Sequence, residues 1–245
     1  LLEIYQQEKD WERCLEIAEK LGPGRDGILQ MQTAHFYCEL AQRELKARNL
    51  EAAEKYVKKA QTADHNSVRA TILLGNMEWN RGDCKAAIKS YKQVEAQDVA
   101  YLPEIMPGLM ACYRSLGKMK ELADYLRSLY ERHQGSVVML ALTDILIEEK
   151  SNKQAVDFAL THLADYPDLK VLERLIKLNL NKQEKQPRET LEVLKHAIEK
   201  LMSSQPDYQC EQCGFNAKKL HWRCPSCLRW SSIKPVQGLA CQSNK

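Results

Sequence analysis

The chain has 245 residues, and only 10 are Gly and 8 are Pro, about 7% together against roughly 12% on average. Because Gly and Pro most often interrupt helices, long uninterrupted helices are the leading expectation. A hydrophobic fraction of 44% and a charged fraction of 28% are typical of a globular protein, which excludes disorder and collagen-like repetition. The longest strongly apolar stretch, residues 137–147, is much shorter than the roughly 20 residues that cross a bilayer.

The amino-terminal residues do not resemble a signal peptide, because no basic opening is followed by an apolar core. The first residue is Leu1 rather than Met. We therefore expect the native amino terminus to lie upstream of this sequence.

Cysteine and charge both divide the chain near Tyr208. Five of the nine cysteines lie from Tyr208 onward. The same segment has six basic side chains and one acidic side chain, a net charge of +5; because the whole chain is +3, residues 1–207 carry −2. The sequence thus predicts a mildly acidic body, residues 1–207, and a small basic tail, residues 208–245. The nine cysteines suggest no disulfide framework, which favours a reducing compartment.

The body contains a repeat of about 34 residues. Small or apolar anchor residues recur at equivalent positions, namely Ala53, Ala87, Leu122 and Ala155. They lie 34, 35 and 33 residues apart, which matches the helical hairpin of tetratricopeptide repeats. Such hairpins bury their apolar faces only by stacking, so we predict an all-α superhelix with a concave inner surface.

Further residues fall in register with this repeat. Gly75 occupies the place in the first helix of a hairpin where a small residue lets the partner helix approach, and Gly82 and Gly117 lie in the turns between helices. Pro167 closes a repeat. Pro107-Gly108, in a helix that opens near Pro103, is the exception, and we expect it to distort or delay that helix.

Additional hairpins flank these repeats. Upstream, the spacing from Cys14 to Ala53 is about five residues longer than one repeat. Cys14 fits the template if the loop 22–27 contains these extra residues. Downstream, residues 171–180 and 188–203 form one more hairpin, joined by a polar loop that contains Pro187. We predict about six hairpins, with the first cut at its amino end. Cys14 and Cys84 occupy packing positions and are expected to be buried small hydrophobes.

A concave repeat surface binds partners and rarely catalyses reactions, and the sequence contains none of the catalytic or phosphate-binding motifs that would suggest an enzyme. Counting from the anchors places a candidate partner groove on the first helix of each hairpin, formed by Arg69, Ile72, Asn76, Trp79, Glu104, Arg114 and Asp144. A simpler interpretation is that these are ordinary solvated helix residues. The set that clamps a peptide carboxylate in some tetratricopeptide domains is incomplete, since Cys38 and Ile72 stand where a Lys would help.

The tail has the spacing of a metal site. Two Cys-x-x-Cys pairs, Cys210 with Cys213 and Cys224 with Cys227, are separated by ten residues. Each pair can turn two thiolates toward one ion, and two pairs supply the four corners of a tetrahedral site. Because so short a tail cannot fold by apolar burial, the ion should contribute on the order of 10 kcal/mol to folding.

Other residues of the tail have simpler roles. Phe215, Trp222 and Trp230 would form its small core or its contact with the repeats, and His221 is expected at the surface because four thiolates complete the ligand shell. Cys241 has no partner in sequence. A thioredoxin-like pair would need a βαβ unit, which the sequence lacks. Both zinc and iron accept four thiolates.

Repeats followed by Tyr-Gln-Cys-Glu-Gln-Cys-Gly-Phe, Trp-Arg-Cys-Pro-Ser-Cys and Trp-Ser closely resemble the lipopolysaccharide assembly protein B family of Gram-negative bacteria. The resemblance covers the whole chain. It implies an inner-membrane protein, anchored by an amino-terminal helix that this sequence lacks, with its repeats and a rubredoxin-like domain in the cytoplasm.

The resemblance also implies a function. In that family the protein restrains lipopolysaccharide synthesis by promoting turnover of the deacetylase LpxC by the protease FtsH, and helps to organise lipopolysaccharide assembly proteins. Its metal ligands carry over onto Cys210, Cys213, Cys224 and Cys227, with iron as the usual ion. True rubredoxins have a Gly after the second pair and a longer spacer, whereas this chain has Leu228, which argues against electron transfer.

Three functions compete on the sequence. The leading hypothesis is a non-enzymatic adaptor in which repeats and tail together present a client to a protease. The second is nucleic-acid binding by a basic zinc ribbon through Arg223, Arg229, Lys218 and Lys219, although we expect no nucleic-acid partner because packing accounts for both Trp residues. The third is a redox or iron-sensing scaffold.

Overall fold

A computed structural model describes residues 1–22, 27–149, 152–166, 168–180, 192, 194–196, 198–200, 202–203 and 205–236. Within these residues the chain forms eleven α-helices, one 3₁₀-helix and three short strands. The predicted fold class, helical repeats with a small metal-binding ribbon, is confirmed. By their contacts the residues divide into two units, Leu1–Leu116 with Trp222–Ser232 and Gly117–His221 with Ile233–Lys245.

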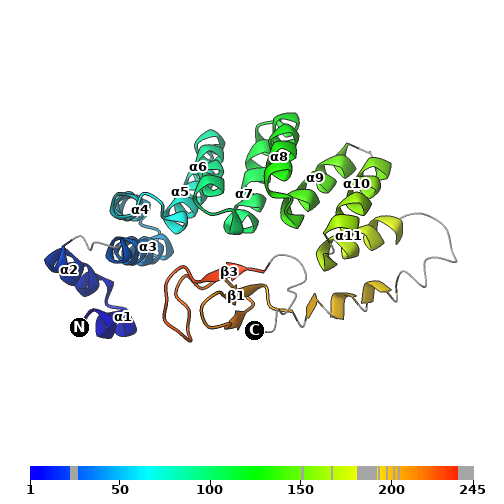
Figure 1. Cartoon of the computed structure of the whole chain (residues 1–245). Coiled ribbons are helices and arrows are strands. Elements are labelled where there is room, and N and C mark those ends of the chain that lie inside the picture. The colour runs from blue at the N-terminus through cyan, green and yellow to red at the C-terminus, as the bar shows by residue number, and fades with distance from the viewer. Residues whose placement is uncertain are drawn as a thin grey trace. The chain divides into compact units, whose positions relative to one another are not determined.

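The first unit contains three helical hairpins and the helix that begins the next (Figure 1). Its elements are α1 (Leu2–Glu8), α2 (Trp11–Leu21), α3 (Ile28–Lys46), α4 (Leu50–Ala63), α5 (Val68–Asn80), α6 (Cys84–Gln97), the 3₁₀-helix η1 (Val99–Tyr101) and α7 (Leu102–Ser115). Helices α1, α3 and α5 pack on α2, α4 and α6, respectively. We call α1, α3, α5 and α7 the A helices; α5 packs on both α3 and α7.

The second unit continues the pattern. Its helices are α8 (Met119–His133), α9 (Ser136–Glu148), α10 (Asn152–Asp165) and α11 (Leu169–Leu180). Each packs on the next, and α9 also packs on α11. Three strands, β1 (Tyr208–Cys210), β2 (Asn216–Ala217) and β3 (Ile233–Pro235), form an antiparallel sheet in the order β2-β1-β3.

Tight turns set the hairpins of the first unit. A residue with positive φ ends the A helix before α2, α4 and α6, at Lys9, Arg48 and Gly82, respectively. The next residue, Asp10, Asn49 or Asp83, then accepts a hydrogen bond on its side chain from the backbone N–H three residues later. Such an N-cap is worth about 1 kcal/mol, so the local sequence fixes where each second helix begins.

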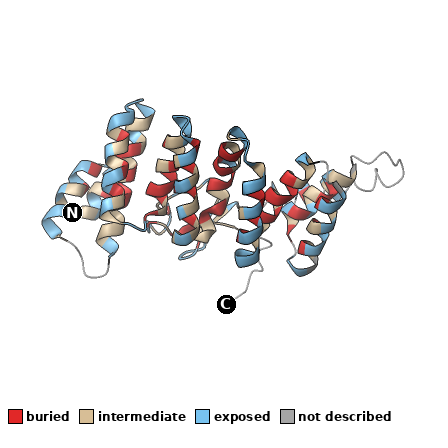
Figure 2. Cartoon of the chain, turned by 90° about the horizontal axis from the view of Figure 1, so that it is seen from above, coloured by how far each residue is buried: buried red, intermediate tan, exposed pale blue. Residues whose placement is uncertain are grey.

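The repeat anchors lie in the core of the array. Ala53, Ala87, Leu122 and Ala155 lie on α4, α6, α8 and α10, and all are fully buried. In each unit the buried residues gather on helix sides that face neighbouring helices (Figure 2). The predicted hairpin register is therefore confirmed at each anchor.

Gly75 and Gly108 contact the same buried ring. A Cβ added at Gly75 would lie 2.7 Å from Tyr91 Cε1, and one added at Gly108 would lie 2.6 Å from Tyr91 Oη. The Tyr91 hydroxyl donates to Asn76 Oδ1 at 2.7 Å, which fixes the ring. Gly108 is thus the place where α7 approaches α6, and the unusual Pro107-Gly108 pair has a packing reason.

Pro107-Gly108 was expected to distort or delay α7, but Pro107 does not interrupt the helix. The helix begins near Pro103 as predicted, after η1, and continues through Pro107 to Ser115. Other predicted features, the residues 23–26, Pro167, Pro187 and Cys241, lie outside the described residues. Among the helices described, none combines the length and apolarity needed to cross a membrane.

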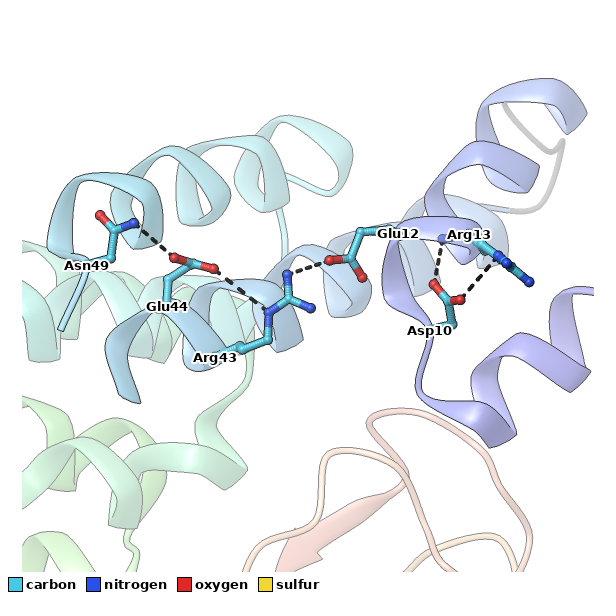
Figure 3. A network of polar contacts seen from close by, with 6 residues as sticks. All are labelled: Asp10, Glu12, Arg13, Arg43, Glu44 and Asn49. Carbon is cyan, nitrogen blue, oxygen red and sulfur yellow. Dashed lines mark hydrogen bonds and ion pairs between the residues drawn. The ribbon is translucent and has the colours of Figure 1, made fainter. Parts of the chain in front are cut away.

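Polar contacts join α2 to α3 at the surface (Figure 3). Arg43 of α3 pairs with Glu12 of α2 and lies 3.8 Å from Glu44, which accepts a hydrogen bond from Asn49 at 3.0 Å. Arg43 and Glu12 are about half exposed, so each pair contributes at most about 1 kcal/mol. The buried faces, not this network, hold the two helices together.

The packing around Tyr91 predicts that Gly75→Ala and Gly108→Ala each lower the free energy of unfolding by roughly 1–3 kcal/mol, because the added methyl group overpacks a fixed ring. Urea denaturation followed by circular dichroism measures the change. Lys85→Ala, an exposed substitution on α6, is the matched control and should stay within about 0.5 kcal/mol of wild type. Equal stability of all three variants would refute this packing account.

Candidate metal centre and its docking on the repeats

The four predicted ligands lie together. The Sγ atoms of Cys210, Cys213, Cys224 and Cys227 are all within 4.8 Å of one another. Cys210 and Cys224 are buried, Cys227 is half-buried and Cys213 is exposed. A cluster of four thiols fits a tetrahedral ion with sulfur ligands and is consistent with zinc or iron, so a four-cysteine metal-binding site is present.

The two Cys-x-x-Cys segments have the same backbone turn. In the first, the Cys210 carbonyl accepts from Gly214 N–H at 2.9 Å, and Cys210 N–H donates to the Phe215 carbonyl at 2.8 Å. In the second, which we call the second knuckle and define as residues 222–232, Cys224 makes the equivalent bonds to Leu228 and Arg229 at 2.9 and 2.8 Å. Each turn therefore positions its pair of thiols through two backbone hydrogen bonds.

Leu228 occupies the place where rubredoxins have a glycine. Its φ is 60°, close to the 72° of Gly214. A side chain in this left-handed region costs of order 1 kcal/mol or more. Leu228 therefore has nearly the same backbone φ as Gly214 of the first Cys-x-x-Cys turn, at a cost in strain.

The second knuckle docks on the first unit of repeats through Trp230. This ring is 6% exposed, and it stacks on His35 of α3 with 4.6 Å between ring centroids. Trp11 of α2 and Phe36 of α3 meet its ring edge-on, each at 6.0 Å. Removing such a buried Trp side chain costs about 3–5 kcal/mol, so this one residue accounts for much of the docking.

Hydrogen bonds fix the knuckle to α1 and α3. Trp230 Nε1 donates to Gln6 Oε1 at 3.1 Å, and Arg223 donates from Nη1 to the Gln6 carbonyl at 3.0 Å. His35 Nε2 and Ser231 Oγ share a hydrogen bond of 2.7 Å. Gln6 is 4% exposed, so its two bonds form in an environment where an unmet polar group would be costly.

Trp222 is held against the face of the A helices. Its ring stacks on Tyr101 of η1 with 5.0 Å between centroids, and it lies 6.0 Å from the His35 ring. The guanidinium carbon of Arg69, from α5, is 5.7 Å from the ring centroid. Arg69 Nη2 also bonds Glu39 Oε1 at 3.0 Å and Gln42 Oε1 at 2.7 Å. Trp222 and Trp230 thus contact the repeats, which is the second of the two roles that the sequence left open for them.

Burial changes the protonation of the groups under the knuckle. It lowers the pKa of His35 to about 3, with a further contribution from the positive charge of Arg69. His35 is therefore neutral at physiological pH. Burial also raises the pKa of Cys14 to about 11 and that of Cys38 to about 12, which fits packed, unreactive thiols. Cys14 and Cys84 are buried, as predicted.

The predicted groove residues have different surroundings. Arg69 is only 2% exposed and lies beneath Trp222, so the expectation that it faces an open groove is wrong while the knuckle is docked. Ile72 is also buried. Two more groove residues have partners within the chain: Asn76 is hydrogen-bonded to Tyr91, and Asp144 in the second unit pairs with Arg174 of α11. The remaining three are at least partly accessible to solvent: Trp79 is 39% exposed, Glu104 is half-buried and Arg114 is exposed. A groove that binds a partner stays a prediction.

The basic residues of the tail are only partly available to a nucleic acid. Lys218, Lys219 and Arg229 are exposed. Arg223 instead donates to the Gln6 and Leu228 carbonyls and lies over the Trp230 ring. With both Trp residues in contact with the repeats as well, packing accounts for the side chains that would otherwise stack on bases.

The His35 environment predicts a pH dependence. Because the folded-state pKa is about 3 and the ordinary pKa is 6.5, the unfolded chain takes up a proton below pH 6.5 that the folded chain does not. This part of the stability is complete above pH 6.5 and falls by up to about 1.4 kcal/mol per pH unit as the pH drops toward 3. The urea concentration at the unfolding midpoint should fall more between pH 7.5 and pH 5.5 for wild type than for His35→Asn. Equal falls in the two proteins would contradict this assignment.

Metal content tests the ligand set. We expect Cys210→Ser, Cys213→Ser, Cys224→Ser and Cys227→Ser each to lose the ion from natively purified protein, because three thiolates bind it far more weakly. Cys112→Ala, which changes a buried thiol of α7, should keep one ion per chain. Elemental mass spectrometry measures both and distinguishes iron from zinc. Full metal content in any of the four Ser variants would remove that residue from the set.

Comparison with known proteins agrees with the geometry. A family model described as a rubredoxin metal binding domain matches residues 208–235. Lipopolysaccharide assembly protein B of Escherichia coli strain K12 is 35% identical over 240 residues, which are 98% of this chain and 62% of that protein. The Haemophilus influenzae protein of the same name is 32% identical over 96% of this chain and 60% of its own length. The chain thus spans about three fifths of these curated relatives.

Solved structures of low sequence identity are also similar. PilF of Pseudomonas aeruginosa is 15% identical, with a TM-score of 0.48 over 84% of this chain and 90% of its own. MamA of Desulfovibrio magneticus RS-1 is 17% identical, with a TM-score of 0.44 over 75% of this chain and 99% of its own.

Proposed function

Because the chain is related over nearly its whole length to lipopolysaccharide assembly protein B, we propose that it is a non-enzymatic adaptor in lipopolysaccharide assembly. More specifically, it promotes FtsH-dependent proteolysis of the deacetylase LpxC and coordinates lipopolysaccharide assembly proteins at the cytoplasmic side of the inner membrane. Stacked helical hairpins offer an extended surface for protein partners, which supports this role.

The docking of the second knuckle on the A helices is the observation that carries the proposal. Trp230, Ser231 and Arg223 fix the knuckle to α1 and α3. The second knuckle and the repeats of the first unit are therefore held against each other by buried contacts, so that one client can contact both. This is the arrangement that a joint binding platform needs.

Charge supports the same division of roles. With +5 on residues 208–245 and −2 on residues 1–207, we assign the array to 1–207 and the rubredoxin-like domain to 208–245. The four thiols are the metal ligands, with iron suggested by the family and zinc the alternative. Exposed charges act over about 8 Å at physiological salt, so the charge difference orients partners near contact.

A reconstituted proteolysis assay tests this function. FtsH is purified and placed in membranes, and it is incubated with LpxC and the metal-loaded chain. The loss of LpxC is then followed over time. We expect faster loss with wild type and with Lys85→Ala, and about tenfold less stimulation with Trp230→Ala, because a buried aromatic anchor of the platform is removed. If wild type leaves the rate of LpxC loss unchanged and captures neither protein, the adaptor function is wrong.

A further inference from the structure

The four thiols of the metal centre differ in how far solvent reaches them. Cys210 is 2% exposed and Cys224 is fully buried, whereas Cys227 is half-buried and Cys213 is exposed. The rest of the turn around Cys213 is open as well, since residues 211–214 are all exposed. Among the four ligands, Cys213 is therefore the one that a dissolved reagent reaches most easily.

Metal binding supplies the second property of a reactive cysteine. The nucleophile toward an oxidant is the thiolate and not the thiol. A thiol that coordinates a metal ion is deprotonated outright, so Cys213 is a thiolate in the metal-loaded chain. Exposure and thiolate character together decide which cysteine of a protein is oxidised first.

The cysteines of the repeats lack both properties. Cys14, Cys38, Cys84 and Cys112 are all buried. Burial raises the pKa of Cys14 to about 11 and the pKa values of Cys38 and Cys112 to about 12. These three thiols are therefore protonated at physiological pH, and the buried repeat cysteines are internal controls for any reagent that attacks exposed thiolates.

A second thiol lies within reach of Cys213 in the same turn. The Sγ atoms of Cys210 and Cys213 are within 4.8 Å of one another. The turn between them is closed by the hydrogen bond of 2.9 Å from Gly214 N–H to the Cys210 carbonyl. Oxidation-sensitive cysteines often have such a neighbour, which converts their first oxidation product into a disulfide.

We propose that Cys213 is a peroxide-reactive site whose oxidation empties the metal centre. The Cys213 thiolate attacks hydrogen peroxide, so that the O–O bond breaks, an S–O bond forms and hydroxide leaves, which gives a sulfenic acid. The Cys210 thiolate then attacks the Cys213 sulfur, the S–O bond breaks, a second hydroxide leaves and a disulfide forms. In total, two thiolates lose two electrons and one peroxide is reduced to two hydroxide ions.

The disulfide removes half of the ligand set. Only Cys224 and Cys227 are left as thiolates, and two ligands bind an ion far more weakly than four. The inference goes beyond the proposed adaptor function, because it gives the metal centre a response to an oxidant. One consequence rests on that function: since the proposed platform needs the docked second knuckle, peroxide should lower its activity.

Zinc release from the full chain tests the proposal. Zinc-loaded protein is treated with hydrogen peroxide, and the released ion is followed with a chromogenic chelator; zinc is chosen because it has no redox chemistry of its own. At half release the remaining thiols are alkylated and mapped by mass spectrometry. We expect a disulfide between Cys210 and Cys213 in the fraction that has lost zinc, while the buried repeat cysteines are still alkylated as free thiols.

Histidine replacements separate the exposed ligand from the others. An imidazole nitrogen completes a zinc site with three cysteines, but it forms no sulfenic acid. We expect Cys213→His to hold zinc and to release it under peroxide about tenfold more slowly than wild type. Cys227→His is the matched control: it replaces a half-buried ligand and keeps both Cys210 and Cys213, so its rate of release should stay within about twofold of wild type.

Equal rates of release from the two His variants would overturn the proposal. So would a map in which zinc is lost while Cys213 is still a free thiol, or in which the repeat cysteines are oxidised as early as Cys213. If Cys213→His holds no zinc before peroxide is added, the order of oxidation mapped in wild type decides alone. Because these assays contain neither LpxC nor FtsH, their failure leaves the adaptor function standing, and failure of the proteolysis assay leaves this result standing.

Discussion

The burial of Trp230 is the interaction on which the start of the array and the docking of the second knuckle depend. The ring joins a segment near the carboxyl end to α1, α2 and α3 at once, through Gln6, Trp11, His35 and Phe36. Helix α1 has seven residues, too few to be stable in isolation, and Gln6 is its buried residue. The start of the array is therefore stabilised by a partner more than 200 residues away in sequence.

This contact gives the metal ion an influence beyond its four ligands. The ion holds the turn that presents Trp230, and that turn contains Leu228 at a φ of 60°, a conformation that costs free energy. Without an ion, a few backbone hydrogen bonds within the turn are left to offset that cost. Metal occupancy and the conformation of the knuckle that carries Trp230 are therefore linked.

Sequence reasoning succeeded where the signal is local or periodic. The anchors Ala53, Ala87, Leu122 and Ala155 predicted the hairpin register, because a close helix approach demands small or apolar residues at a fixed period. The spacing of the cysteines predicted the metal site for a similar reason. Gly75 predicted a close approach, and Gly108 completes the same contact around Tyr91.

It did not identify the repeat residues that the tail contacts. Nothing in the sequence near Arg69 indicates that Trp222 covers it, so Arg69 was expected in an open groove. The same holds for Gln6 and His35, whose partners lie 224 and 196 residues away. The one available signal was a pair of Trp residues in a tail too small to bury both.

Amide hydrogen exchange in α1 and α3 tests the central claim most directly. We predict that metal-loaded Trp230→Ala loses protection in α1 and the middle of α3, by about a hundredfold or more for a contact of about 3 kcal/mol, while α4 and α6 keep theirs. Unchanged protection of α1 in this variant would contradict the claim that the docked knuckle holds the first repeats in place.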